Sequence, residues 1–413
     1  MKKLEQTFLW IFLFTIPFGA RTLLFAGTNE YQSRFLYASD IALIGLFLMW
    51  LFFEHKKKSI DRALSIPLAL LISWFFLSSV FSPNSFLGFY QTTKLIEFLW
   101  LFYYIRSMKF PEIVFQAIVA SALFQSLIAI AQFASQHSLG LRLLGEQVLA
   151  PIIAGVAKLD VGGEKLVRAY GTFPHPNVLA VFLFLTLFVL VASFARPSKS
   201  GDTFKLICIP FLTLALLLTF SRVVIILSVF IILFSLFVRK ERGMLGVFLL
   251  SLAIFFVILS PYLPLAAFLS RFSIDPQEQA VNLRLFYAKN ALSATRTHPL
   301  LGVGPGQFTR YQEQTIIKNK LPEWINQPAH NIYLLLAAEA GLPALFFFFC
   351  FLFALFSHSR KSTILNSLFI ILFVIGLFDH FFFTYQQGAL LFWLTLGLSS
   401  GKVKELKEER SKI

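Results

Sequence analysis

A histidine stands at the entrance to a long apolar stretch near the end of the chain. His330 and Asn331 follow a polar loop that closes with Pro328, and an apolar run begins immediately after them. Imidazole has the unperturbed pKa closest to neutrality, so His330 is suited to accept a proton there. A helix start also favours a polar residue, but Asn331 is suited to that task. We therefore predict His330 as an acid–base catalyst, with Asn331 beside it in contact with the substrate.

Two arginines could bind an anion. Arg222 interrupts an almost unbroken apolar run over residues 204–238. A charge at mid-membrane costs about 2.5–3.5 kcal/mol on insertion scales, so Arg222 should lie at the surface. There it either caps a helical hairpin and reaches lipid headgroups or binds phosphate through its planar guanidinium. Arg284 stands early in a predicted amphipathic helix over residues 281–295, whose apolar face should carry Leu285, Ala288 and Leu292. For Arg284 itself a solvated helix face is the simpler interpretation.

Three closely spaced glycines follow that predicted helix. Gly302, Gly304 and Gly306 could turn backbone N–H groups toward an anion of the substrate. No strand precedes them, so the pattern is neither a Rossmann nor a P-loop signature. A tight turn that steers the chain is the alternative.

A stiff polar segment precedes another apolar run. Arg168 opens it, and His175 lies between two prolines that restrict the backbone. Asn177 follows as a candidate N-cap of the next helix. We predict that these three residues contact the substrate, with capping as the alternative for Asn177.

Two pairs of ionisable residues lie within apolar runs. Lys94 and Glu97 are three positions apart and could pair on one helix face. Asp379 and His380 stand near the end of another run. Such groups are functional candidates by default, and we predict that Lys94 contacts the substrate, with pairing to Glu97 as the alternative. The sequence names no partner for Asp379 or His380 and assigns them no role.

The elements that must position these residues are membrane helices. The chain has 413 residues, of which 57% are hydrophobic and only 14% are charged, against about 45–50% and 25% in soluble domains. The apolar residues form blocks of roughly 17–25, the length that crosses a bilayer. We predict one all-α integral membrane domain over residues 1–413. Its twelve expected spans are 7–25, 36–53, 66–82, 91–105, 112–134, 177–195, 204–219, 223–238, 244–261, 331–356, 363–383 and 387–400.

The seventh and eighth spans depend on a length argument. As a single helix, residues 204–238 would extend about 52 Å, far more than the hydrocarbon core of about 30 Å. We expect the chain to turn back at residues 219–222. Alternate short connections then carry most of the Lys and Arg residues, which places both termini in the cytoplasm. Residues 135–176 and the large loop 262–330, between the ninth and tenth spans, fall on the outer face.

Several classes of protein are excluded by the sequence. The net charge of +15 is distributed between spans, as the positive-inside rule expects, and therefore does not indicate nucleic-acid binding. Cys208 and Cys350 both lie in expected spans, so no disulfide is predicted. Neither metal-ligand spacing nor a nucleophile elbow occurs on the expected outer face. We expect chemistry without a metal or cofactor.

The motifs resemble those of the O-antigen ligase family, which includes O-antigen ligases, related polymerases and bacterial protein O-oligosaccharyltransferases. The likeness covers roughly residues 165–345. It is carried by Gly171-Thr172-Phe173 to Asn177, by Thr219-Phe220-Ser221-Arg222, by the loop with Arg284 and the glycines, and by His330-Asn331 followed by Gly341. Ala344 departs from the family pattern, in which Gly, Thr or Val usually stands three positions after that glycine.

The resemblance implies a GT-C-like fold with about twelve membrane helices in the bacterial cytoplasmic membrane. It implies an inverting, metal-independent transfer of a glycan from undecaprenyl pyrophosphate to an acceptor hydroxyl on the outer face. By position, Arg222 and Arg284 would stabilise the pyrophosphate leaving group, and His330 would activate the acceptor.

Alternatives remain open at this point. A ligase and a polymerase share these motifs and differ in the acceptor, which could be a lipid glycan, a growing polysaccharide or a protein. A transporter of lipid-linked saccharide would place its polar residues near the bilayer midplane on broken helices. A non-catalytic scaffold would not need Arg222, Arg284 and His330 to converge.

Overall fold

The computed structural model describes residues 2–53, 61–108, 111–161, 163–193, 202–229, 257, 279–359 and 363–400. Helices dominate this part of the chain, because an apolar segment in a bilayer must satisfy its backbone groups internally. The longer helices are α1 (Lys2–Thr15), α2 (Ala38–Phe53), α3 (Arg62–Val80), α4 (Ser85–Ser107), α5 (Pro111–Ser135), α6 (Pro176–Ser193), α7 (Asp202–Leu218), α11 (Gln279–Thr297), α12 (Phe308–Lys318), α13 (Ile332–Ser359), α14 (Thr363–Phe378) and α16 (Gln386–Ser400).

Two β-hairpins interrupt the helices, and an all-α fold did not anticipate them. The antiparallel pairs are β1 (Arg21–Phe25) with β2 (Arg34–Tyr37), and β3 (Lys158–Val161) with β4 (Glu164–Val167). The first pair corrects the expected span 7–25, because α1 ends at Thr15 and the remaining apolar residues form β1. Hydropathy alone cannot distinguish a short apolar strand from the continuation of a helix.

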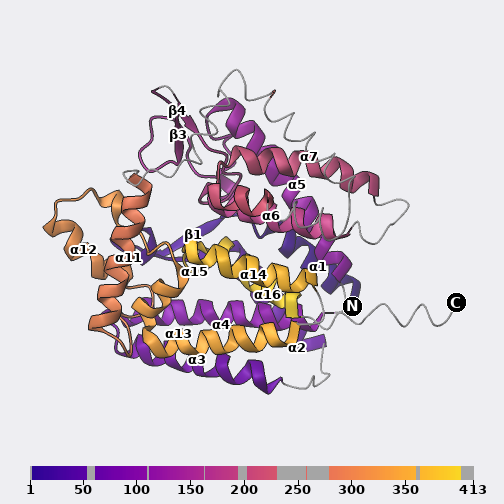
Figure 1. Cartoon of the computed structure of the whole chain (residues 1–413). Helices are drawn as coiled ribbons and strands as arrows, with labels where there is room; N and C mark the ends of the chain where they lie inside the picture. The colour runs from indigo at the N-terminus through magenta and orange to yellow at the C-terminus, as the bar shows by residue number, and fades with distance from the viewer. Residues whose placement is uncertain are drawn as a thin grey trace.

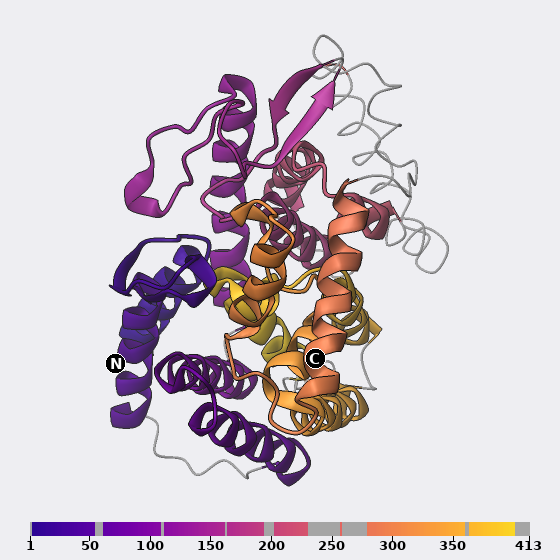
Figure 2. The same cartoon turned by 90° about the vertical axis from the view of Figure 1, so that its left-hand side faces the viewer.

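The helices pack in two groups whose axes run side by side in Figure 1. One group contains α3, α4, α13, α14 and α16, and the other contains α1, α5, α6 and α7. The remaining helices α11 and α12 and both hairpins gather at one end of the bundle, on the left of Figure 1. Figure 2 looks onto this end, where α11 crosses the front of the bundle. We call it the loop end.

Three of the described helices are long and apolar enough to cross a membrane, namely Arg62–Val80, Glu112–Ser135 and Ile332–Ser357. Four shorter apolar helices accompany them: Ala38–Phe52, Pro176–Val191, Ile207–Leu218 and Asn366–Phe378. The predicted count of twelve spans stays a prediction. The expected span 244–261, apart from residue 257, and most of 223–238 lie outside the described residues.

The turn expected at residues 219–222 coincides with an interruption of the helix. α7 ends at Leu218, Phe220 has a φ of 49°, and residues 222–229 are helical again. Arg222 is therefore the first residue of the second helical segment.

The predicted helix over residues 281–295 is present as α11, but it packs through a different face. Leu285 and Leu292, expected on the buried face, are 54% and 42% exposed, whereas Tyr287, Ala291 and Ala294 are buried. Two small residues on the packed face allow α11 to approach α13 closely. Side-chain size, rather than hydrophobicity alone, selected the contact face.

α13 is broken at Gly341, where the backbone adopts φ 83° and ψ 172°. A side chain is essentially excluded from that region of the Ramachandran plot. A Cβ at Gly341 would also lie 1.8 Å from the carbonyl oxygen of Leu300. The break therefore lets the loop before α12 lie directly against the backbone of the helix.

The backbone groups released by this break find partners outside the helix. The N–H groups of Val303 and Gly304 donate to the carbonyls of Ala338 and Glu339, at 2.8 and 2.9 Å. Trp74 of α3 donates its indole N–H to the carbonyl of Ala340 at 3.1 Å. The loop, α3 and α13 are thus joined by hydrogen bonds, which fixes the start of α13 at the loop end.

Candidate functional site

His330 is held in one tautomer immediately before α13. The side chain of Asn331 accepts hydrogen bonds from the N–H groups of Tyr333 and Leu334, at 2.9 and 3.0 Å, and therefore caps the helix as predicted. His330 is free of that task. Its Nδ1 lies 3.2 Å from the carbonyl oxygen of Pro328. Because a carbonyl can only accept, Nδ1 carries the proton, and the lone pair of the neutral ring is on Nε2.

Aromatic and histidine rings enclose the imidazole of His330. Tyr287 of α11 stacks on it with 5.2 Å between ring centroids. His380 meets it edge to face at 4.7 Å. Segments from three distant parts of the sequence thus meet around one imidazole.

Asp379 and His380 are the partners that the sequence did not identify. The expected span 363–383 is corrected here, because α14 ends at Phe378 and a short helix, α15 (Phe381–Thr384), follows the two residues. The carboxylate of Asp379 accepts a hydrogen bond from the N–H of His380 at 2.8 Å. Two ionisable residues at the end of an apolar run marked this position as a candidate in the sequence. Only the fold shows that they face His330.

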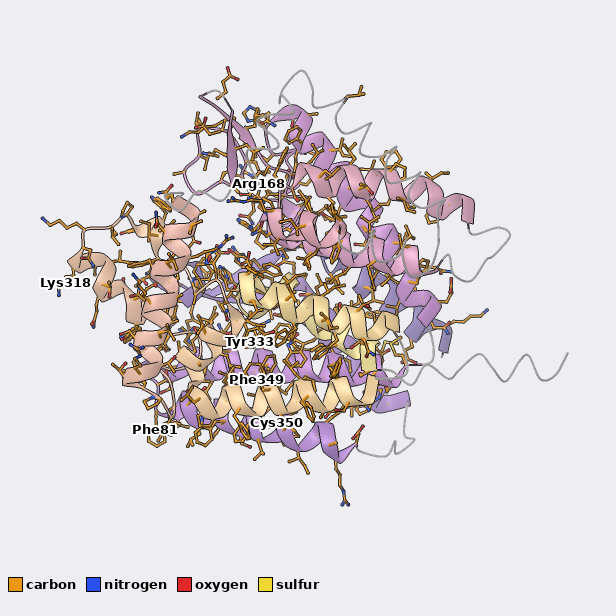
Figure 3. All side chains as sticks on the ribbon, in the orientation of Figure 1. Phe81, Arg168, Lys318, Tyr333, Phe349 and Cys350 are labelled. Carbon is orange, nitrogen blue, oxygen red and sulfur yellow. The ribbon has the colours of Figure 1, made fainter. Side chains whose placement is uncertain are left out.

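A chain of hydrogen bonds connects Asp379 to the turn after α7. Asn177 donates to Asp379 Oδ2 at 2.8 Å and accepts from the guanidinium of Arg168 at 2.9 Å. Arg168 also donates through Nε to the carbonyl of Thr219 at 2.5 Å. Figure 3 labels Arg168 in the upper part of the molecule and Tyr333 of α13 below it. Arg168 and Asn177 thus connect the site to the segment that carries Arg222.

The predicted N-cap role of Asn177 is wrong. α6 begins at Pro176, and the carbonyl of His175 accepts the N–H of Val178 at 3.0 Å. Proline suits the first helical position because that position needs no N–H donor. The amide of Asn177 is therefore available to bridge Arg168 and Asp379.

The electrostatics of the cluster keep Asp379 ionised. Burial raises the pKa of Asp379, but the positive charges that His330, His380 and His175 carry when protonated and the hydrogen bond from Asn177 lower it more, to about 2. Burial lowers the pKa of His175 and of His380, each to about 3. Both histidines are therefore neutral at neutral pH.

His330 is also neutral at neutral pH. Burial lowers its pKa below 6.5, the Asp379 carboxylate partly restores it, and the positive charge of Arg284 lowers it again. A neutral imidazole with its lone pair on Nε2 is the form that can accept a proton.

Arg284 belongs to the same electrostatic environment as the histidines. Its charge lowers the pKa of both His330 and His175. Its buried Nε has no hydrogen-bond partner among the described residues. A guanidinium with an unused donor beside a neutral base is suited to an anionic group of a substrate.

The glycines of the loop do not present free N–H groups to an anion. The N–H of Gly302 donates to the carbonyl of His298, and that of Gly306 donates to the carboxylate of Glu339 at 2.8 Å. Gly304 donates to α13, as described above. The expected anion cradle is therefore corrected to the alternative of a turn, which here docks on the broken helix.

Lys94 of α4 is paired with carboxylates and not with the histidines. It pairs with Glu97 as predicted, with 3.4 Å between Nζ and Oε2, and also forms an ion pair with Asp40 of α2. Asp40 was not predicted as a partner of Lys94, because it lies on a different expected span.

One group of described residues has the composition of a metal site. His330, Asp379 and His380 each offer a ligand atom, and these atoms lie within 4.8 Å of one another. The sequence spacing did not predict this, since the residues come from two separated segments. The same arrangement suits proton transfer, with the carboxylate stabilising a protonated imidazole.

These features define a helical membrane protein with an acid–base cluster at one end of its bundle. Residues 207–349 match the family model described as O-antigen ligase, and this match supports membership of the O-antigen ligase-like superfamily. The matched region includes Arg222, Arg284, the glycine loop and His330. The first part of the resemblance found in the sequence, residues 165–206, lies outside it. None of the curated proteins compared matches the chain.

This match supports in general an O-antigen ligase-like or polymerase-like membrane enzyme that transfers glycosyl groups. The family belongs to the bacterial inner membrane, and a bilayer with lipid-linked glycans fits it as partners.

Proposed function

We propose that this chain transfers a glycan from undecaprenyl pyrophosphate to an acceptor hydroxyl at the loop end, on the outer face of the cytoplasmic membrane. The observation that carries the proposal is the neutral His330, with Nδ1 directed at the Pro328 carbonyl and an ionised Asp379 nearby. The unpartnered Nε of Arg284 supports an anionic leaving group at the same place.

In the proposed reaction, His330 Nε2 takes the proton of the acceptor hydroxyl as its oxygen attacks the anomeric carbon. The bond from that carbon to the pyrophosphate oxygen breaks, and the pyrophosphate leaves with the electron pair. Attack opposite the leaving group inverts the anomeric centre. Asp379 stabilises the imidazolium, while Arg284 and Arg222 stabilise the developing charge on pyrophosphate.

Purified protein tests the proposal directly. Incubation with undecaprenyl-pyrophosphate glycan and a panel of lipid, polysaccharide and protein acceptors should give a new glycosidic product by mass spectrometry. The acceptor that reacts separates a ligase from a polymerase. Glycan movement across vesicles without any glycosidic product would instead indicate the transporter.

The break in α13 does not favour that transporter. Transporters use unwound helices to expose backbone groups to a substrate cavity. Here the carbonyls of Ala338, Glu339 and Ala340 are occupied by the loop and by Trp74. The break therefore serves docking of the loop.

Two charge substitutions are expected to move the acid limb of the pH–rate profile in opposite directions. Transfer requires neutral His330, so activity falls as pH drops through the pKa of His330. Arg284→Gln removes a charge that lowers this pKa and should move the limb to higher pH. Asp379→Asn removes a charge that raises it and should move the limb to lower pH.

Initial rates between pH 4 and 8 measure both shifts. Arg310→Gln changes an exposed arginine of α12 and should leave the profile in place. His380 and Tyr287 contact the ring of His330 and are unchanged in all three variants. Shifts of the same sign for Arg284→Gln and Asp379→Asn would contradict His330 as the titrating base.

Removal of divalent metal is expected to leave transfer intact. The cluster already supplies a base and an ionised carboxylate, so it needs no metal-bound water. Rates measured with excess EDTA should stay within about twofold of the untreated rate. A loss that zinc restores would reassign His330, Asp379 and His380 to a metal centre.

A further inference from the structure

A pocket opens beside the histidine cluster, between the first β-hairpin, α4 and the junction of α15 with α16. Tyr31 and Tyr385 form the wall that the pocket shares with the cluster. Their hydroxyl oxygens are 3.0 Å apart, and their rings lie 5.8 and 5.7 Å from the ring of His380. A ligand in the pocket would therefore lie next to the proposed reaction centre.

The lining combines aromatic rings with uncharged polar groups. Phe35, Tyr37 and Tyr90 contribute rings that also meet cations, with Arg21 4.1 Å from the Phe35 centroid and Lys94 5.3 and 5.7 Å from those of Tyr37 and Tyr90. Gln91 contributes its amide, whereas the amide of Gln386 already donates to Ser39 and Asp40. The amide of Gln91 makes no hydrogen bond to any described residue, so it keeps both donors and its acceptor available. A sugar ring presents apolar C–H faces and hydroxyls that both donate and accept, which this lining complements.

The cations of the pocket are already neutralised. Arg21 forms an ion pair with Glu30 at 2.7 Å, and Lys94 is paired with Asp40 and Glu97. A second phosphate or a uronic acid would find no unpaired positive charge there. The pocket therefore differs from the surroundings of Arg284, where a guanidinium nitrogen lacks a partner.

We propose that this pocket binds a neutral sugar ring of the glycan chain, one unit away from the sugar that reacts. The inference rests on the proposed transfer function for its place in the reaction. The ring of Tyr31 is 5.8 Å from that of His380, which is 4.7 Å from that of His330. These two steps place the pocket beside His330 and not at the transferred bond.

Direct binding tests the pocket without any transfer. Saturation-transfer NMR on purified protein should detect neutral methyl hexosides and no signal from the matching uronic acids. Gln91→Leu should weaken binding about tenfold. Gln116→Leu, an equal change on an exposed part of α5, should not. Equal binding by wild type and Gln91→Leu, or stronger binding of the uronic acids, would overturn the inference.

Substrate length identifies which glycan occupies the pocket. Gln91→Leu should raise KM about tenfold with kcat within twofold, and the effect should disappear when that glycan is shortened to its reacting sugar. Disappearance with a short acceptor assigns the pocket to the acceptor, and disappearance with a short donor assigns it to the donor. An effect independent of both lengths refutes the pocket as a sugar site.

The two proposals fail in different ways. If hexosides bind in a Gln91-dependent manner but no glycosidic product forms, the transfer function is wrong and the sugar site stands. If transfer proceeds and Gln91→Leu changes neither binding nor KM, the sugar site is wrong and the transfer function stands. Size-exclusion chromatography in detergent, with equal elution volumes for the variants, establishes that each has folded.

Discussion

Replacing His330 by alanine is expected to reduce glycan transfer by about 10²–10⁴-fold, the usual contribution of a general base. The ring accepts the proton through Nε2 while the Pro328 carbonyl fixes Nδ1. Alanine removes both the proton acceptor and the hydrogen bond that orients it. Asn331 continues to cap α13, so the helix should still begin at the same place.

Transfer rate and membrane insertion measured on the same preparation test this expectation. His298→Ala is the matched control, because His298 is an exposed histidine at the loop end. Among the described residues its side chain hydrogen-bonds to Thr297 and meets the ring of Tyr311 edge to face. The control should retain the wild-type rate. An active His330→Ala protein would remove His330 from the mechanism.

Gly341→Ala is expected to destabilise the protein far more than Gly140→Ala. Both glycines have nearly the same φ, 83° and 84°, so both substitutions carry backbone strain of about 1–3 kcal/mol. A Cβ at Gly140 meets open space, whereas one at Gly341 lies 1.8 Å from the carbonyl oxygen of Leu300. Overpacking of that kind adds roughly 1–3 kcal/mol and displaces the loop from α13.

Thermal unfolding in detergent measures the difference between these two variants, and transfer assays measure its consequence. Gly341→Ala should lower both the unfolding temperature and the transfer rate. Gly140→Ala should lower the unfolding temperature less and leave the rate near that of wild type. Equal effects would show that the contact between Gly341 and Leu300 does not hold the loop.

Apolar block length predicted the positions of most described helices, because membrane burial leaves a continuous helix as the stable form. Interruptions were harder to predict. The break at Gly341 depends on Leu300, and the end of α14 before Asp379 depends on contacts with distant segments. No local pattern encodes those contacts. The first β-hairpin was missed for a related reason, since Leu23, Leu24 and Phe25 of β1 prolong the apolar run that begins in α1.

The candidate site was partly foreseen. His330, Arg284, His175 and Arg168 were selected individually by residue type and position, and the fold brings them to the same cluster as Asp379. Asp379 itself was noticed without a partner, because it follows α14 whereas His330 precedes α13. The two residues are therefore separated in sequence by the whole helical hairpin. The roles of all these residues stay predictions.

The break in α13 also determines an order of events when the protein is made. Carbonyls at the break bond to the preceding loop and to Trp74, and the N–H of Leu342 bonds to the carbonyl of Pro299. In hydrocarbon each such group left unpaired costs several kcal/mol. With the loop outside, as proposed, α13 can reach its final form only after the loop has been translocated and α3 inserted. The final form of α13 therefore depends on two earlier events, the translocation of a loop that precedes it and the insertion of a helix far upstream.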